Sequence, residues 1–206
     1  MSVKKLFLRR RLGFAILGAY LLLSCPAMAG PTALSGRSGT AVASFESPIS
    51  KMEKIDNKQF AVGVVDVNAD LEKIWDVLAD YDNAPLVFDN LKLCQCVGKK
   101  GNTKFVRQVV EPGAALKFDY TVALVEEKPK SMVWQRTSGS LKEVYGKWLL
   151  EPLEPVGKAP RTRVTYRIFL DGGLFLPSWI LTGKAKNYIP TMLSALKQNV
   201  EGKAKP

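Results

Sequence analysis

The sequence predicts an α+β fold in which a curved antiparallel sheet of about seven strands wraps around one long C-terminal helix. Between residues 59 and 170, most segments alternate apolar and polar side chains, as strands with one buried and one solvated face do. Residues 178–200 instead repeat apolar side chains at helical spacing. Only this helix is large enough to cover the apolar face of the sheet. A curved sheet closed by one helix can leave a gap beside the helix, and we expect that gap to be the ligand site.

The first 29 residues have the features of a secretory signal peptide. Five basic residues among the first 11 precede an apolar run at 12–23 and a small-residue pattern at 27–29 (AMA). The run is shorter than the roughly 20 residues of a spanning helix, which favours cleavage after residue 29 and an exported, periplasmic protein. Two variants remain open, namely lipid attachment at Cys25 and twin-arginine export through residues 10–11.

The segment after the signal peptide, residues 30–51, is rich in Gly, Ala, Ser and Thr and is predicted to be a flexible leader. A single folded domain is expected at 52–202, followed by a tail at 203–206. Cleavage would leave 25 basic against 19 acidic residues, so the net charge would fall from +11 to +6. This excess favours peripheral contact with an anionic membrane. No basic cluster interleaved with aromatics indicates nucleic-acid binding, and the sequence carries no signal for an oligomeric state.

The expected elements follow in the order strand, helix, about six strands and long helix. Residues 59–67 are β-branched and apolar, which favours a strand. Asn68 or Asp70 can cap a helix that extends to about residue 81, and one more short helical turn is expected at 85–90. The remaining predicted strands are 91–97, 104–111, 116–125, 131–137, 144–150 and 161–170.

The terminal helix is predicted over residues 178–200. Pro177 suits its first turn. Pro190 lies inside the helix and should bend it, because proline removes a hydrogen bond and crowds the preceding turn.

Histidine is absent from all 206 residues. Its absence excludes every His-based catalytic triad and every His-ligated metal site. Cys94 and Cys96 lie two apart on a predicted strand and should therefore face the same side. We expect them to be small apolar residues, with a strained disulfide or a redox or metal role as alternatives. No cofactor and no metal site are predicted.

Several motifs resemble those of a known superfamily. Residues 75–85 (WDVLADYDNAP) resemble the W-x-V-L-x-D-Y-x-x-x-P motif of START-related polyketide cyclase/dehydrase proteins, and 146–152 (GKWLLEP) resemble their G-x-W-x-L-x-P strand. The segments 162–166, 176–179 and 193–197 are similar to the last strand and terminal helix of this superfamily. The resemblance covers about residues 59–201 and is strongest for the branch that contains the coenzyme Q-binding protein and a ribosome-association toxin.

The resemblance implies a START-like helix-grip fold (SRPBCC) with a cavity for lipids, sterols, quinones or polyketides. Only some members of the superfamily catalyse a reaction. An exported protein could not reach ribosomes, so the sequence departs from the toxin. It also departs from aromatase-type members that use a histidine.

Candidate ligand-binding residues are the aromatic and methionine side chains expected on the inner faces. The same residue types also fill ordinary cores, so core packing is the alternative for each. Buried Tyr hydroxyls and the Trp indole N–H need hydrogen-bond partners, which a ligand carbonyl or hydroxyl could supply. The candidates are Phe118, Tyr120, Trp134, Trp148, Tyr166, Tyr188 and Met192.

Arg136 completes the ligand-binding set. It should share a strand face with Met132 and Trp134, where it could hold a ligand carboxylate or phosphate. The alternative is that it lies near the sheet edge and reaches water.

The apolar segment 172–179 (GGLFLPSW) precedes the long helix and should flank the mouth of the cavity. Leu174, Phe175 and Trp179 are candidate membrane-docking residues, with Lys184 and Lys186 to meet anionic headgroups. Packing of this segment against the sheet is the alternative.

These observations favour non-catalytic binding or transport of a hydrophobic small molecule, such as a lipid, an isoprenoid or a quinone, in the cell envelope. A polyketide-type cyclase or dehydrase is the first alternative, with Asp80 or Asp82 as its acid. Asp in such a segment more often bonds turn amides, so no catalytic residue is assigned. The second alternative is an envelope interaction module with a filled cavity.

Overall fold

The computed structural model describes residues 44–113, 116–157 and 159–202. The predicted signal peptide, most of the predicted leader and the predicted tail lie outside the described residues. In chain order the elements are β1 (Ile49–Ile55), β2 (Lys58–Val67), α1 (Leu71–Ala79), α2 (Ala84–Val87), β3 (Leu91–Lys100), β4 (Thr103–Gly113), β5 (Leu116–Glu127), β6 (Ser131–Gly139), β7 (Glu143–Val156), β8 (Ala159–Asp171) and α3 (Ser178–Glu201).

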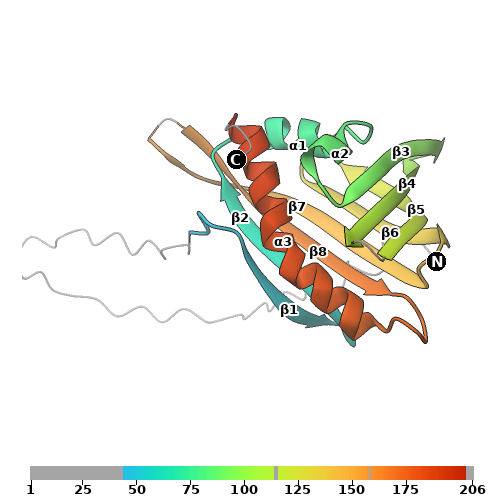
Figure 1. Cartoon of the computed structure of the whole chain (residues 1–206). Coiled ribbons are helices and arrows are strands. Elements are labelled where there is room, and N and C mark those ends of the chain that lie inside the picture. The colour runs from blue at the N-terminus through green and yellow to red at the C-terminus, as the bar shows by residue number, and fades with distance from the viewer. Residues whose placement is uncertain (1–43, 114–115, 158, 203–206) are drawn as a thin grey trace, which may run out of the picture. The chain divides into compact units, whose positions relative to one another are not determined.

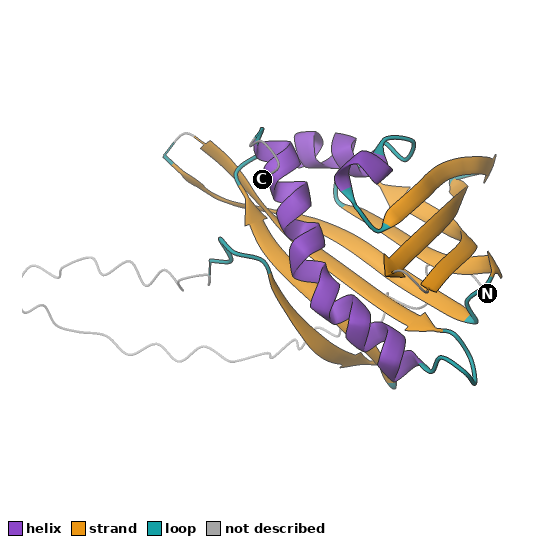
Figure 2. Ribbon diagram, in the orientation of Figure 1, coloured by secondary structure: helices purple, strands orange, loops and turns teal. Residues whose placement is uncertain are grey.

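The strands of the described chain form one antiparallel sheet of eight strands in the order β1-β2-β8-β7-β6-β5-β4-β3. Neighbours in this order are also neighbours in the sequence, except that β2 pairs with β8. The sheet curves, and α3 crosses its concave face (Figure 1). The predicted α+β helix-grip fold is therefore confirmed. Figure 2 shows α1 and α2 near the C-terminal end of α3.

β1 is a strand that the sequence analysis did not predict. It begins at Ile49, so the folded chain starts before residue 52, and residues 49–51 are not part of a flexible leader. Asp56 and Asn57 connect it to β2 with φ angles of 46° and 65°, the left-handed conformation of a tight two-residue hairpin turn. Most side chains of β1 are exposed, because it is an edge strand, and it therefore lacks the apolar face that reveals the other strands.

The helices after β2 match the prediction for this segment. The side chain of Asp70 accepts a hydrogen bond of 2.8 Å from the Lys73 N–H and caps α1. Trp75 is buried on the inner side of α1, and Pro85 occupies the first turn of α2. These helices close one end of the concave face.

Helix α3 lies close against the sheet because β2 has a glycine beneath it. A Cβ on Gly63 would stand 2.1 Å from Cγ2 of Ile189 and 2.9 Å from Cδ1 of Leu193, so only a bare backbone fits there. Ile189 and Leu193 are fully buried at this contact. The apolar side of α3 is thus held on β1, β2 and β8, and its other flank faces the curved part of the sheet.

A buried ionic cluster fixes the start of the described chain to β2 and α3. The carboxylate of Asp66, 1% exposed, accepts hydrogen bonds from Arg163 at 2.8 and 3.0 Å and from the Phe45 N–H at 2.9 Å. Lys197 of α3 donates to the carbonyls of Glu46 and Asp66 at 2.9 and 2.7 Å. Burial opposes the ionisation of Asp66, but the hydrogen bonds from Arg163 and Phe45 outweigh it and lower the pKa of this carboxyl.

Candidate ligand-binding cavity

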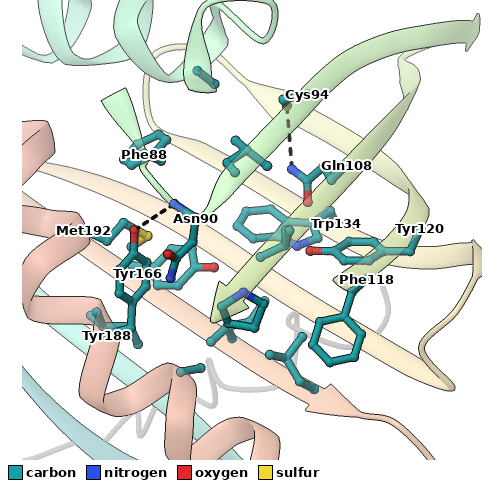
Figure 3. Close-up of a pocket in the computed structure, with 18 of the residues that line it drawn as sticks. Phe88, Asn90, Cys94, Gln108, Phe118, Tyr120, Trp134, Tyr166, Tyr188 and Met192 are labelled. Atoms are coloured by element: carbon teal, nitrogen blue, oxygen red, sulfur yellow. Dashed lines mark hydrogen bonds between the residues drawn. The ribbon is translucent and has the colours of Figure 1, made fainter. Parts of the chain in front are cut away.

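A cavity of about 490 Å³ lies between α3 and the curved sheet. Strands β3 to β8 contribute side chains to it, as do α1, α2 and the part of α3 from Leu181 to Met192. Figure 3 shows aromatic rings from the strands and from α3 around this space. A volume of this size lies within the roughly 300–1,000 Å³ that small-molecule sites occupy. The gap that the sequence predicts beside the helix is present.

The lining is mostly apolar and aromatic. Its apolar members include Leu78, Ala84, Phe88, Leu91, Val110, Pro112, Phe118, Leu124, Met132, Leu141, Ile168, Leu170, Leu181, Ala185, Ile189 and Met192. The members that carry a polar group are Tyr81, Asn90, Cys94, Gln108, Tyr120, Trp134, Trp148, Tyr166, Lys184, Asn187 and Tyr188.

Most of the predicted ligand-binding residues are brought together here. The predicted residues that line the cavity are Phe118, Tyr120, Trp134, Trp148, Tyr166, Tyr188 and Met192. Alternation along β5 to β8 places the five strand residues on the inner face, as expected, and Tyr188 and Met192 reach the cavity from α3. That they contact a ligand stays a prediction.

Arg136 is not among the lining residues. It pairs with Val122 of β5 in the same register that pairs Trp134 with Leu124, but its Nη2 donates to the carbonyl of Gly139 at 2.8 Å. Because the guanidinium turns back to the end of its own strand, its placement gives no support to the prediction that it holds a ligand anion.

Aromatic rings form a continuous row along the cavity. Phe88 stacks on Trp148 with ring centroids 6.4 Å apart, Trp148 meets Tyr166 at 4.4 Å, and Tyr166 meets Trp134 at 6.0 Å. Gly146 is the cross-strand partner of Trp134, and a Cβ there would lie 2.1 Å from two carbons of the indole. The missing side chain therefore lets the Trp134 ring lie flat over β7 instead of filling the cavity.

The phenols of Tyr120 and Tyr166 face the cavity in their neutral form. Burial is the main cause that raises the pKa of each, and for Tyr166 the nearby Tyr120 and Tyr188 add to it. At neutral pH both hydroxyls can therefore donate a hydrogen bond.

Two further tyrosines tie the walls of the cavity together. The hydroxyl of Tyr81 donates to the Glu126 carboxylate, which also accepts from Lys104 at 2.7 Å. The hydroxyl of Tyr188 on α3 accepts a hydrogen bond of 3.4 Å from the Asn90 N–H (Figure 3). The second contact links α3 to the segment that precedes β3.

The lining offers little for acid–base chemistry. Among the described residues that line the cavity, none is Asp or Glu, and Lys184 is the single one that carries a charge. Cys94 is a free thiol, and burial raises its pKa to about 11, so it stays protonated at neutral pH. Gln108 donates to its sulfur at 3.8 Å. Cys96, on the same strand, is free and exposed.

The two aspartates of the catalytic alternative lie outside the cavity lining. Asp80 accepts hydrogen bonds from the Asn83 N–H at 3.4 Å and from its Nδ2 at 2.9 Å. Asp80 and Asp82 are both exposed. This geometry is that of a side chain that stabilises a turn.

Some lining residues were missed by sequence reasoning. Gln108 lies between Val106 and Val110 on β4, so the alternation of that strand could have revealed it. Leu141 is buried in the connection from β6 to β7, where no periodic pattern applies. Asn90 follows α2 in a short connection and gave no signal either.

The mouth of the cavity lies at the first half of α3. Lys184 and Asn187 line the cavity and are exposed, as is Pro112 at the end of β4. Three apolar side chains just before α3 and in its first turn are strongly exposed, namely Leu174 at 97%, Phe175 at 96% and Trp179 at 72%.

Packing of these three side chains against the sheet, the alternative considered for this segment, is therefore wrong. That they contact a membrane stays a prediction. Among the described helices, none combines the length and apolarity that a membrane-spanning segment requires.

Comparisons with solved structures agree on the fold. The STAR-related lipid transfer protein of Xanthomonas axonopodis is similar with a TM-score of 0.60 at 14% identity, over 78% of this chain and 97% of its own. The lipid transfer and protein localization domain of human StarD13 has a TM-score of 0.60 at 15% identity, over 77% of this chain and 86% of the domain. The Zhui aromatase/cyclase of Streptomyces sp. R1128 has a TM-score of 0.57 at 15% identity, over 69% of this chain and 93% of the cyclase chain.

No curated protein matches the chain. A family model described as polyketide cyclase / dehydrase and lipid transport matches residues 67–197, from the end of β2 to the last turns of α3. The match spans more than half of the chain and includes every strand from β3 to β8. The chain therefore belongs to the polyketide cyclase/dehydrase and lipid transport family.

Proposed function

We propose that the protein binds a hydrophobic small molecule, namely a lipid, an isoprenoid or a quinone, inside the cavity and does no chemistry on it. The observation that carries the proposal is the 490 Å³ cavity with its row of aromatic rings. Each 100 Å² of apolar ligand surface that leaves water there contributes about 2.5 kcal/mol. We place this activity in the cell envelope, because the first 29 residues have the pattern of a signal peptide.

The enzymatic alternative lacks a plausible general base. A cyclase or dehydrase needs a group that takes a proton near neutral pH. The cavity-lining residues described above provide neutral tyrosines, a protonated thiol and the exposed Lys184. This donor set suits binding better than proton abstraction. The filled-cavity alternative is disfavoured by the volume of the cavity.

The test is to identify what the protein carries. The mature chain is purified, extracted with organic solvent and analysed by mass spectrometry. A stable, unaltered hydrophobic compound in stoichiometric amount supports the proposal, and a turnover product from added compound contradicts it.

A cavity-filling variant makes the extraction specific. Ala185→Trp places an indole in the cavity from α3 and should abolish co-purification. Ala159→Trp is the matched control, because Ala159 is exposed at the start of β8 and does not line the cavity. If both variants retain the compound, it is bound elsewhere and the cavity is not its site.

We further propose that the segment before α3 docks on an anionic bilayer so that ligand can enter at the mouth. The exposed apolar side chains are Leu174 and Phe175 just before α3 and Trp179 in its first turn. The stem of Lys142 lies 4.0 Å from where a Gly173 side chain would begin, and Lys184 is exposed on the mouth itself. Apolar insertion flanked by lysines is the arrangement that favours anionic lipid surfaces.

Liposome pelleting tests this docking surface. Leu174→Glu with Phe175→Glu should abolish pelleting with vesicles of phosphatidylglycerol and phosphatidylethanolamine. Val156→Glu, at an exposed apolar residue at the end of β7, is the control and should pellet like the wild type. Unchanged pelleting of the double variant would refute the docking surface and would leave the proposal of ligand binding in the cavity unaffected.

A further inference from the structure

Three hydrogen-bond donors that lie close together on the cavity wall have no partner among the described residues. The Tyr120 hydroxyl, the Tyr166 hydroxyl and the Trp134 indole N–H all line the cavity, and within the described residues none of the three forms a hydrogen bond. Tyr120 and Trp134 are each only 7% exposed. Their polar atoms are not enclosed by protein but open into the cavity. A ligand that excludes water from this region must offer them a partner, because a polar group left buried and unpaired is unfavourable by roughly 1–3 kcal/mol. Their position on the cavity wall indicates that a ligand supplies the partner.

The three donors belong to one region of the cavity. The rings of Trp134 and Tyr166 have centroids 6.0 Å apart, and the Tyr120 phenol is close enough to Tyr166 to raise its pKa. Figure 3 shows the Tyr120 ring beside Trp134, with its oxygen directed toward the middle of the cavity. One polar group of a ligand could therefore meet two or three of these donors.

The groups in this region favour a ligand atom that accepts hydrogen bonds. The indole N–H can only donate, and both phenols are neutral at physiological pH because burial raises the pKa of each. No carboxylate belongs to the described lining, so nothing there balances a cationic ligand. Lys184 and Asn187, by contrast, lie exposed at the mouth.

We propose that the ligand is a hydrophobic molecule with a carbonyl-type oxygen, as in a quinone, ketone or ester, and that this oxygen is buried against Tyr120, Tyr166 and Trp134. The hydrocarbon remainder of the ligand extends toward Lys184. This inference rests on the proposed function, since it requires that the cavity takes a hydrophobic ligand. Beyond the proposed function, the inference names the functional group of the ligand that the site recognises and the orientation of the ligand in the cavity.

The test uses two probes that differ by one oxygen atom. Benzophenone and diphenylmethane have nearly the same shape, and only benzophenone has a carbonyl. Their affinities are measured by displacement of Nile red from the delipidated protein. Tyr120→Phe and Tyr166→Phe remove single hydroxyls without a change of ring, and Tyr145→Phe, on the outer face of β7 and outside the lining, is the matched control.

We expect each cavity variant to weaken benzophenone binding about three- to tenfold, as the loss of one neutral hydrogen bond does, and to leave diphenylmethane binding unchanged. The Tyr145→Phe control should bind both probes like the wild type. Equal affinities of wild type and both variants for benzophenone would overturn the inference and leave the proposed function standing. A variant that loses both probes equally would also overturn it, because the hydroxyl would then only shape the cavity. Failure of the wild type to bind either probe would contradict the proposed function itself.

Discussion

A single added methyl group at Gly146 should reduce both stability and ligand binding. In Gly146→Ala, the new Cβ would stand 2.1 Å from two carbons of the Trp134 ring and 2.5 Å from its Nε1. Ordinary contact begins near 3.4 Å, so the indole has to move by about 1.3 Å away from β7. The backbone of a paired central strand cannot yield by that much. The ring must therefore move into the cavity and occupy part of its 490 Å³.

The expected cost follows from measurements of overpacked cores. Forcing a methylene into a well-packed site destabilises a protein by about 1–3 kcal/mol. We expect a loss of stability in the lower half of this range, because the indole can move into the empty volume of the cavity. Nile red affinity should fall at least severalfold, since the displaced ring occupies space that the probe needs.

Equilibrium unfolding in urea, followed by circular dichroism, measures the first effect, and Nile red titration measures the second. Gly183→Ala is the matched control, because a Cβ there meets nothing within 4 Å, and the change should stabilise α3 by about 0.5–1 kcal/mol. The double variant Gly146→Ala with Trp134→Leu should recover part of the loss in stability. If Gly146→Ala unfolds and binds like the wild type, the Trp134 ring is not held against β7 and the account of the cavity wall is wrong.

Other regions give further predictions. Gly63→Ala should destabilise the fold by about 1–3 kcal/mol in urea unfolding, because its Cβ would overlap α3, and a wild-type midpoint would refute the close approach of helix and sheet. Asp66→Asn should cost roughly 3 kcal/mol at pH 7, since it leaves Arg163 without its charged partner. The pKa of Asp66 is lowered in the folded protein, so its ionised carboxylate stabilises the fold fully above about pH 4. This part of the unfolding free energy is lost as the pH falls through the folded pKa. Acid unfolding curves of Asp66→Asn should lack this loss. Iodoacetamide at pH 8 should alkylate Cys96 well before Cys94, whose pKa is raised to about 11 by burial, and mass spectrometry showing equal rates would contradict the buried position of Cys94.

The sheet could be predicted from the sequence because alternation records which face of a strand is buried. On β8, Val164, Tyr166, Ile168 and Leu170 mark the inner face in the sequence and lie on it in the structure. β1 was not predicted, because the side chains of this edge strand are mostly exposed and its sequence therefore has no alternating apolar pattern.

The candidate lining and the presence of a gap beside the helix could be predicted, but the volume of the cavity could not. Its volume depends on how closely α3 approaches β2 at Gly63 and on where the Trp134 ring comes to lie. Both are relations between distant parts of the chain. Arg136 stays in register with Trp134, yet its guanidinium bonds the Gly139 carbonyl at the end of its own strand. Strand alternation indicates the face of a residue but not the direction that a long side chain takes, so this placement could not be predicted.

The four tryptophans of the chain lie in three different surroundings. Trp75 is buried between α1 and the sheet, Trp134 and Trp148 border the cavity, and Trp179 stands exposed before the mouth. Variants that keep one indole at a time would therefore report separate events by their own emission. Trp75 would follow unfolding, Trp134 or Trp148 the arrival of a guest molecule, and Trp179 the moment at which the protein meets a lipid surface, all without an attached dye.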